Sequence, residues 1–413
     1  MPSSTFNSDN AYQTTDPRNR LRVALYTLAA GIFLFGGVVL IYNGMLALLY
    51  SAGGNINGRV VDQIEHLPEI VEENRDKQKV FVFGSSMVQA GFEPTVFDSA
   101  MAARGVDSIS YNYGIGNLNP TFQELITRRI QEQFLKGRGR LALALVEFTP
   151  FQATIVRNKF GAITADQNIA LLSSRAELWE ITRHDPTRGI RLINIRYLRD
   201  SVSAELITSI PALLTSSIEN NARNVAYRAA LVRTDELEAE FDELRGSDEP
   251  IQGSDRWNVA LRGGRIDKSG YSREVLDAMG AWVASRRHPE FMKADLQRRI
   301  ESADILELGF DDRQIDKFIE LVRNFLPIAD HVEVIIMPRN SDWVTYTPEV
   351  QDRLDGVLRR IAQETGVYVR DFQNDPRITA EHYIDTTHLS FHDGIDAFSR
   401  ILAEEYADVV KGH

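Results

Sequence analysis

The chain has 413 residues, of which 43% are hydrophobic, and a formal net charge of -12. Its length favours a compact domain with a large insertion, or two domains, and its acidic balance argues against a nucleic-acid-binding protein, which would present a basic face. It contains no cysteine, which excludes disulfides, thiol catalysis and cysteine-ligated zinc.

The N-terminal part predicts a membrane anchor. Residues 1–22 are mostly polar and are expected to form a disordered cytoplasmic tail. Residues 23–50 carry no charge and exceed the ~20 apolar residues that cross a bilayer, whereas a cleaved signal peptide has an apolar region of about 7–15 residues. Arg18, Arg20 and Arg22 precede this span, so the positive-inside rule predicts a single-pass inner-membrane protein whose body lies outside the cytoplasm, in the periplasm.

A linker is expected over residues 51–76, in which residues 60–75 look like a short helix or a tether. The first strand follows at residues 79–83 and ends at Gly84-Ser85-Ser86. Helices are expected at residues 87–90 and 94–104. A strand, a tight turn and a helix can present a nucleophilic serine beside amides that face an oxyanion. Alternatively, Ser85 or Ser86 only caps the helix.

The second strand is expected at residues 108–113, followed by Gly114-Ile115-Gly116-Asn117 and a helix over residues 121–135. Glycines after a strand are common in turns, but they also let a backbone N–H approach a substrate oxyanion. The third strand is expected at residues 141–148 and ends at Thr149-Pro150.

Residues 156–310 interrupt this alternation of strands and helices. They are rich in Arg, Glu and Asp, show no clear strand, and predict a helical insertion with a polar loop over residues 246–264. A solvated helical face or a lid is the first interpretation. A surface that binds a partner or a polymer is the alternative.

The alternation resumes with a helix at residues 311–325, a strand at 332–337, a helix at 349–365, a strand at 367–372 and a final helix at 394–409. The expected core is therefore formed by residues 77–155 and 311–413, as an α/β fold with a parallel sheet covered by helices on both faces. Sites in such sheets gather at the carboxyl ends of the strands. The candidate residues that follow a strand are Ser86, Gly116, Thr149, Arg339 and His388.

The last loop contains the sequence Asp385-Thr386-Thr387-His388. A carboxylate at this spacing can orient the imidazole and stabilise the imidazolium, while the imidazole accepts a proton from a nucleophile elsewhere. A solvated turn or a helix cap is the alternative. Among the eight histidines only His388 has Asp three residues earlier; no metal site and no cofactor are predicted.

Three motifs, Gly84-Ser85-Ser86, Asn112-x-Gly114-x-Gly116 and Asp385-x-x-His388, resemble the SGNH (GDSL-like) hydrolase superfamily. The resemblance covers residues 77–155 and about 328–410 and implies a flavodoxin-like three-layer core. It also implies that Ser86 is the nucleophile and that Asp385 and His388 complete a triad. Backbone amides of Ser86 and of Gly116, with Gly114 as the less favoured alternative, would form an oxyanion hole. The single anchor and the Gly-Ser-Ser turn look most like the membrane-anchored branch, which includes the DltD family and alginate O-acetyltransferase-like proteins.

The chain departs from the family at the third block, where Gly-x-Asn-Asp would supply an oxyanion-hole Asn. Here the third strand ends in Glu147-Phe148-Thr149-Pro150. Losing one such donor lowers the rate by about 10²–10³-fold. Asn117 or Asn119 is expected to substitute, or the backbone amides suffice.

The resemblance and the anchor together predict a serine acyl-ester transferase or esterase that O-acetylates, or D-alanylates, an envelope or secreted polysaccharide. Arg339 and Trp343 are expected to contact the substrate. The resemblance alone implies a membrane-bound O-acyltransferase as a partner that supplies the acyl group. Two alternatives are a non-catalytic SGNH-like module that binds a polymer or a membrane partner, and an extracellular esterase or lipase.

Overall fold

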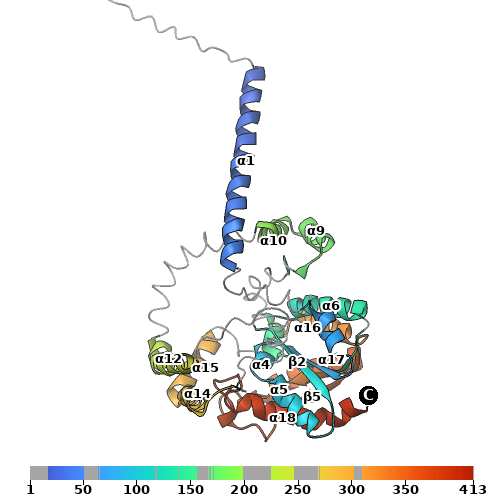
Figure 1. Ribbon diagram of the computed structural model, residues 1–413, viewed down its shortest axis with the longest axis vertical. Helices are drawn as coiled ribbons and strands as arrows, with labels where there is room; N and C mark the ends of the chain where they lie inside the picture. The colour runs from blue at the N-terminus through green and yellow to red at the C-terminus, as the bar shows by residue number, and fades with distance from the viewer. Residues whose placement is uncertain are drawn as a thin grey trace, which may run out of the picture.

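The computed structural model describes residues 17–50, 64, 66–116, 119–137, 139–155, 166, 169–170, 172–198, 225–245, 268, 270–301 and 309–412. The first element is the 34-residue helix α1 (Pro17–Tyr50), which stands apart from the rest of the chain (Figure 1). Its window Leu21–Val38 is long and apolar enough to span a membrane, and none of it is buried against the protein. The expected apolar membrane-spanning helix is confirmed to this extent.

A five-stranded sheet, parallel throughout, forms the centre of the fold, in the order β2-β1-β3-β4-β5. This is the strand order of flavodoxin-like sheets. The strands are β1 (Gln78–Gly84), β2 (Ser108–Gly114), β3 (Leu141–Glu147), β4 (Ala329–Ile336) and β5 (Tyr368–Asp371). Every residue of β3 is buried, as expected for a central strand covered on both faces. The predicted α/β class and parallel sheet are therefore confirmed.

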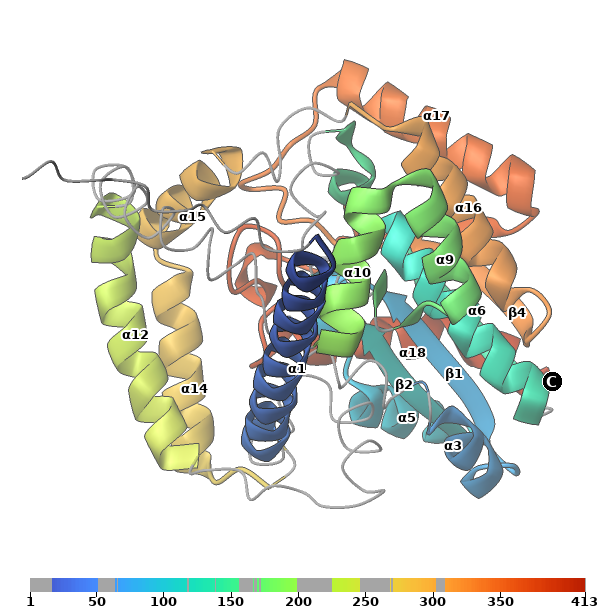
Figure 2. The ribbon, with the colours of Figure 1, turned by 90° about the horizontal axis from the view of Figure 1, so that it is seen from above.

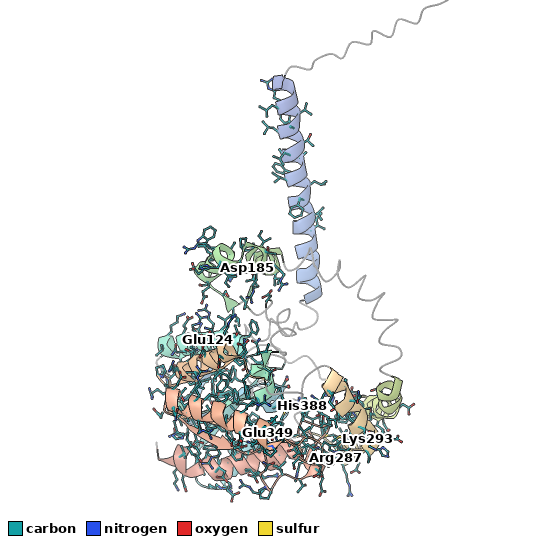
Figure 3. The ribbon with its side chains drawn as sticks, turned by 180° about the vertical axis from the view of Figure 1, so that it is seen from behind. Glu124, Asp185, Arg287, Lys293, Glu349 and His388 are labelled. Carbon is teal, nitrogen blue, oxygen red and sulfur yellow. The ribbon has the colours of Figure 1, made fainter. Side chains whose placement is uncertain are left out.

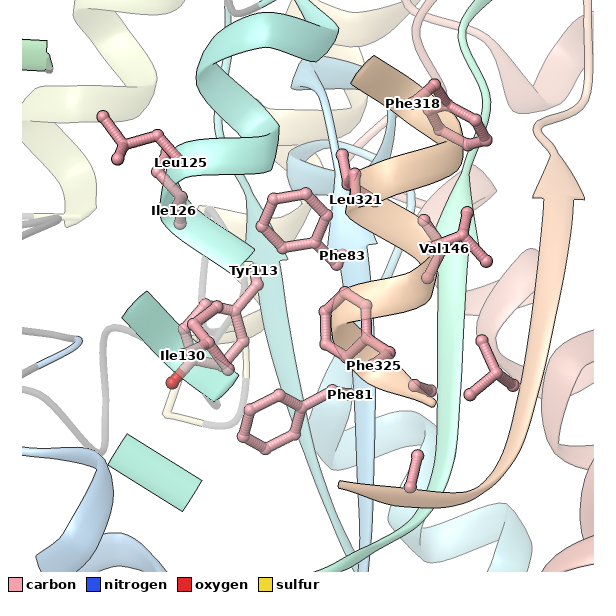
Figure 4. Packing of buried hydrophobic residues seen from close by; sticks show 14 of the residues in the cluster. Phe81, Phe83, Tyr113, Leu125, Ile126, Ile130, Val146, Phe318, Leu321 and Phe325 are labelled. Atoms are coloured by element: carbon pink, nitrogen blue, oxygen red, sulfur yellow. The ribbon is translucent and has the colours of Figure 1, made fainter. Parts of the chain in front are cut away.

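Helices cover both faces of the sheet. On one face, Phe81 and Phe83 of β1 pack against Ile126 of α6 and Phe325 of α16 (Figure 4). The alternate residues Val80 and Val82 belong to a second cluster on the other face, because successive side chains of a strand point to opposite sides. The first face carries α3 (Leu67–Glu73), α6 (Pro120–Gly137), α16 (Asp312–Phe325) and α17 (Pro348–Thr365), and the second carries α5 (Pro94–Ala102) and α18 (Gly394–Lys411).

The helix α3 corrects one expected boundary. Ile64, Leu67, Ile70 and Val71 are buried in the cluster that covers the first face of the sheet. The spacing of Leu67, Ile70 and Val71 places them on one side of α3, which packs against α6. The linker predicted for residues 51–76 therefore ends before α3, and residues 51–63 lie outside the described part of the chain.

Within the insertion, all the described elements are helices. Their bounds are α9 (Arg175–His184), α10 (Pro186–Leu198), α12 (Val225–Arg245), α14 (Arg273–Arg286) and α15 (Pro289–Glu301). The α9 helix is joined to α6 by ion pairs and α10 packs against α9, whereas α12, α14 and α15 form a separate group (Figures 1 and 2). The loop predicted at residues 246–264 lies outside the described residues.

Candidate active site

The turn after β1 separates the roles of its two serines. Ser85 is buried, and its Oγ accepts a hydrogen bond from the Met87 amide at 3.1 Å, so it caps the short helix α4 (Ser86–Gln89). Ser86 is the first residue of α4 and is partly exposed. The cap and the candidate nucleophile are therefore different residues.

Two glycines let α4 approach the sheet closely. A Cβ on Gly84 would lie 2.3 Å from Glu147 Oε2, and a Cβ on Gly114 would lie 2.1 Å from the Gln89 backbone N. Real Cβ atoms do not approach other atoms so closely. Any side chain at Gly114 would displace the backbone of α4 and with it the Ser86 hydroxyl.

The Asn112 side chain fixes α4 from the β2 side. Its Nδ2 donates to the carbonyl groups of Phe92 at 2.6 Å and Val88 at 3.1 Å, and its Oδ1 accepts from the Gly114 amide at 2.9 Å. In the sequence Asn112 was part of a motif without an assigned role. The structure shows that it holds the helix that begins at Ser86.

Ser86, His388 and Asp385 form a continuous hydrogen-bonded chain. His388 Nε2 lies 3.0 Å from Ser86 Oγ, and His388 Nδ1 lies 2.9 Å from Asp385 Oδ2. A proton on Nδ1 that is donated to Asp385 leaves Nε2 free to accept the Ser86 proton. His388 lies on the side of the sheet that faces α14 and α15 (Figure 3). The structure therefore brings together the three residues predicted from sequence.

Backbone hydrogen bonds hold the Asp385 carboxylate in place. Its Oδ1 accepts from the amides of His388 at 2.7 Å and Thr387 at 2.8 Å, which leaves Oδ2 for the imidazole. Burial by itself would raise the pKa of Asp385, but His388 and Arg299 outweigh burial and hold this pKa well below its usual range. Asp385 is thus ionised whenever His388 accepts a proton.

Sequence reasoning missed an ion-pair network that α15 contributes to this loop. Arg299 Nη2 lies 3.2 Å from Asp385 Oδ2, and Arg299 Nε donates to Asp295 Oδ2 at 2.8 Å. Asp295 also accepts from the Thr386 hydroxyl at 2.5 Å. Asp295 and Arg299 are four residues apart on a helix, a spacing that is common on solvated faces, so nothing local connects them with His388.

Other insertion residues bind the same loop. Arg287 donates to the Tyr383 carbonyl at 2.8 Å and to Asp393 at 2.7 Å. Trp282 of α14 stacks on Phe391 with ring centroids 6.0 Å apart. Because these contacts surround the loop that carries His388, α14, α15 and Arg287 between them form part of the wall of the site.

Glu147 lies beneath the Ser85 turn, as the last residue of β3. Its carboxylate is 2% exposed and accepts hydrogen bonds from the Ser85 amide at 2.6 Å and the Thr149 hydroxyl at 2.5 Å. Burial raises the pKa of Glu147, and the hydrogen bonds from Ser85 and Thr149 only partly offset this.

A cavity of about 30 Å³ lies near the candidate site, although Ser86, Asp385 and His388 themselves are not among its described lining residues. It is lined by Met87 and Thr387, the chain neighbours of Ser86 and His388, and by Arg339. The Arg339 guanidinium lies 3.8 Å from the centre of the Tyr346 ring. The remaining lining residues are Glu147, Phe148, Thr149, Pro150, Phe151, Ile336, Met337, Pro338, Val344, Tyr346 and Gln373.

The other predicted site residues fall in different places. Gly116 lies beside the nucleophile, because a Cβ on it would be 3.5 Å from Ser86 Cβ. Asn117 lies outside the described residues. Asn119 is buried just before α6, where its carbonyl accepts the Phe122 amide. Trp343 is partly buried and is not among the described residues that line the cavity.

The chain matches no known protein-family model. No curated protein is similar enough in sequence to count as a relative. Any functional conclusion therefore rests on the residues and geometry of the site.

Proposed function

We propose that the protein is a membrane-anchored serine acyl-ester transferase or esterase of the SGNH type, with its active site outside the cytoplasm. One observation carries the proposal: the Ser86, His388 and Asp385 side chains are joined by contacts of 3.0 and 2.9 Å. Their positions after β1 and after β5 match the carboxyl-end location of sites in parallel sheets.

In the first step, His388 Nε2 takes the Ser86 proton as Ser86 Oγ attacks the carbonyl carbon of an acyl donor. The protonated imidazole, stabilised by Asp385, then gives this proton to the leaving oxygen, and an acyl-Ser86 ester remains. In the second step, an acceptor hydroxyl or water gives its proton to Nε2 and attacks the ester. Ser86 recovers its proton as the product leaves.

The negative oxygen that forms in both steps requires donors close to Ser86. The backbone amide of Ser86 is one of the helix N-terminal amides that lack an intrahelical acceptor. Gly116 is close enough to Ser86 for its amide to serve as the second donor. Asn117 remains a candidate third donor from the sequence.

The cavity favours a small acyl group. At about 30 Å³ it has room for about two water-sized groups, which suits an acetyl group. A D-alanyl group would bring its ammonium toward the cationic Arg339, which disfavours it. Acetyl is therefore the preferred acyl group, and a hydroxyl of an envelope or secreted polysaccharide is the proposed acceptor, with a membrane-bound O-acyltransferase as the proposed donor partner.

The proposed topology places the N-terminus in the cytoplasm and everything after α1 outside it. Arginines before the apolar window of α1 support this orientation. A C-terminal alkaline phosphatase fusion, which needs an oxidising compartment, should be active, and a matching cytoplasmic reporter should be inactive. The reverse pattern would contradict the topology.

A second candidate is a non-catalytic SGNH-like module that binds a polymer or a membrane partner. The observation that favours it is the absence of the third-block Asn, since β3 and the residues Phe148-Thr149-Pro150-Phe151 that follow it contain no Asn. A water-using esterase or lipase is a third candidate, which would turn over soluble esters without an added sugar acceptor.

The test exposes the detergent-solubilised full chain to a serine-reactive fluorophosphonate and to p-nitrophenyl acetate, with intact-mass detection. The two adjacent serines provide a matched pair of variants. Ser86→Ala should abolish the adduct, whereas Ser85→Ala removes only the α4 cap and should keep it. An unlabelled wild-type chain would favour the non-catalytic module, and an adduct that survives in Ser86→Ala would exclude Ser86 as nucleophile.

A further inference from the structure

We infer that Arg299, supplied by the insertion, is a positioning residue that keeps Asp385 charged beside a second buried carboxylate, Asp295. The inference rests on the proposed function, because it assigns Arg299 a role in supporting the His388 base. It also gives the insertion a part in the chemistry, in place of the lid or solvated face expected from sequence.

The geometry places one guanidinium between two carboxylates. Arg299 is 7% exposed and Asp295 is 1% exposed, and Asp385 is 6% exposed. Arg299 contacts Asp295 Oδ2 at 2.8 Å and Asp385 Oδ2 at 3.2 Å. Its Nη2 is also 3.4 Å from His388 Nδ1. Arg299 and the His388 imidazole therefore contact the same oxygen atom, Asp385 Oδ2.

The other charged groups near Asp385 do not replace Arg299. On α15, Arg298 binds Asp295 Oδ1 at 2.8 Å, whereas Arg299 binds Oδ2. On the loop itself, His388 is the only titratable neighbour that the described structure places in contact with Asp385. From β3, Glu147 acts on His388 from a distance and adds a further acidic group. Arg299 is thus the permanent positive charge that touches Asp385.

Two buried carboxylates without an intervening cation do not both stay ionised, because burial and mutual repulsion favour a shared proton. Burial, and after it the charge of Asp385, act to raise the pKa of Asp295, whereas Arg299 and the hydrogen bonds from Thr386 and Arg298 together lower it below its usual value. Without Arg299, a proton would be held between Asp295 and Asp385. A protonated Asp385 no longer stabilises the imidazolium of His388.

The sign of the pH dependence follows from this. With Arg299 present, Asp385 keeps its charge into acidic solution. Without it, the carboxylate pair takes up a proton at a higher pH, so activity is lost first on the acidic side. Replacing Asp295 by Asn removes the repelling charge and lets Asp385 ionise again.

The experiment measures the rate constant of fluorophosphonate labelling at Ser86 between about pH 5.5 and 9 for the full chain in detergent. The variants are Arg299→Gln, the double variant Arg299→Gln/Asp295→Asn, and Arg287→Gln as matched control, because Arg287 binds the same loop without touching Asp385. At the acidic end of this range the Arg299→Gln chain should be labelled at least about tenfold more slowly than wild type. This corresponds to a shift of the acidic limb of the rate profile by about one pH unit. At the alkaline end the difference from wild type should be smaller.

The double variant should label faster than Arg299→Gln, and Arg287→Gln should keep the wild-type shape of the pH profile. A purely structural role predicts the opposite order, since the double variant removes more contacts. Wild-type kinetics in Arg299→Gln, or a double variant no faster than the single one, would overturn the inference.

A second readout does not depend on catalysis. Arg299→Gln should lower the midpoint of thermal unfolding more at pH 7 than at pH 5, because the unpaired carboxylates must ionise at the higher pH, and Asp295→Asn should reverse this loss. If the wild-type chain is not labelled, the proposed function fails, and these midpoints still decide whether Arg299 neutralises the pair. Equal losses at both pH values would count against it.

Discussion

The Glu147 carboxylate accepts hydrogen bonds from both the backbone amide and the hydroxyl group of Ser85, at 2.6 and 3.1 Å. Ser85 in turn caps the helix on which Ser86 stands. A buried acid on β3 thus determines where the candidate nucleophile lies, although it touches neither Ser86 nor the base through any hydrogen bond found in the described residues.

Glu147→Gln should preserve the turn, whereas Glu147→Ala should not. The Gln carbonyl can accept the Ser85 amide, and its NH₂ group can donate to hydroxyls that rotate to accept. Ala leaves the buried Ser85 amide unpaired, at a cost of about 1–3 kcal/mol. Chemical unfolding of the two variants measures the difference, and equal stability of both would contradict the role of Glu147.

The raised pKa of Glu147 gives the Gln variant a pH signature. An acid whose pKa is higher in the folded chain makes folding less favourable as the pH rises through its unfolded pKa of about 4.3. Glu147→Gln should therefore gain stability relative to wild type as the pH rises above about 4. If Glu147→Gln instead lost stability relative to wild type as the pH rose, the ionised carboxylate would be stabilised by its hydrogen-bond donors.

Asp385→Asn should lower the labelling rate of Ser86 by an amount on the order of 10⁴-fold, the effect of this change in a serine-protease triad. Asn Oδ1 can still accept the hydrogen bonds from the amides of Thr387 and His388. The NH₂ group of Asn then faces His388 Nδ1 and forces the imidazole proton onto Nε2.

Since the pKa of Asp385 is held low, its ionisation stabilises the fold above the unfolded pKa of about 3.9, and this stabilisation is lost as the pH falls. The stability difference from Asn should therefore shrink in acid. A labelling rate close to that of wild type would remove Asp385 from the triad.

Gly114→Ala should displace α4 and slow labelling, because the new methyl group would lie 2.1 Å from the Gln89 backbone N. Overpacking of this kind typically costs about 1–3 kcal/mol. Gly356→Ala in α17 is the matched control, since its nearest neighbour is a flexible Arg359 side-chain atom at 4.0 Å. It should stabilise the chain by about 0.5–1 kcal/mol and leave labelling unchanged. If the Gly114→Ala chain were labelled at the same rate as the control, the close packing of α4 on β2 would not be what positions Ser86.

Enlarging the cavity should relax the preference for a small acyl group. The wild-type chain should react faster with p-nitrophenyl acetate than with the butyrate ester, and Val344→Ala, which removes two methyl groups from the lining, should reduce this ratio. Val350→Ala, which packs against the core and not on the cavity, should leave it unchanged. A ratio that is the same in all three chains would show that the acyl group binds elsewhere.

The sheet and the central residues of the site were predictable because their signals are local. Apolar runs define β1 and β3, and Asp385 and His388 are separated by two residues. Whether Ser85 or Ser86 faces the base depends on the direction of one turn, which periodicity does not encode. Asp295 reaches Thr386 over 91 positions, and an acidic–basic pair on a helix has the same pattern whether it is solvated or buried. A short helix or a tether was expected at residues 60–75, and the structure has the seven-residue helix α3 there. So short an apolar segment does not reveal from sequence that it packs on the core.

Ser86 and His388 are separated by 302 positions along the chain. During synthesis the serine therefore emerges well before its proton acceptor and the carboxylate that supports it. Truncated or prematurely released chains therefore contain Ser86 and its turn but no base. In the proposed enzyme, acyl chemistry begins only after the loop that follows β5 has folded back against the turn after the first strand.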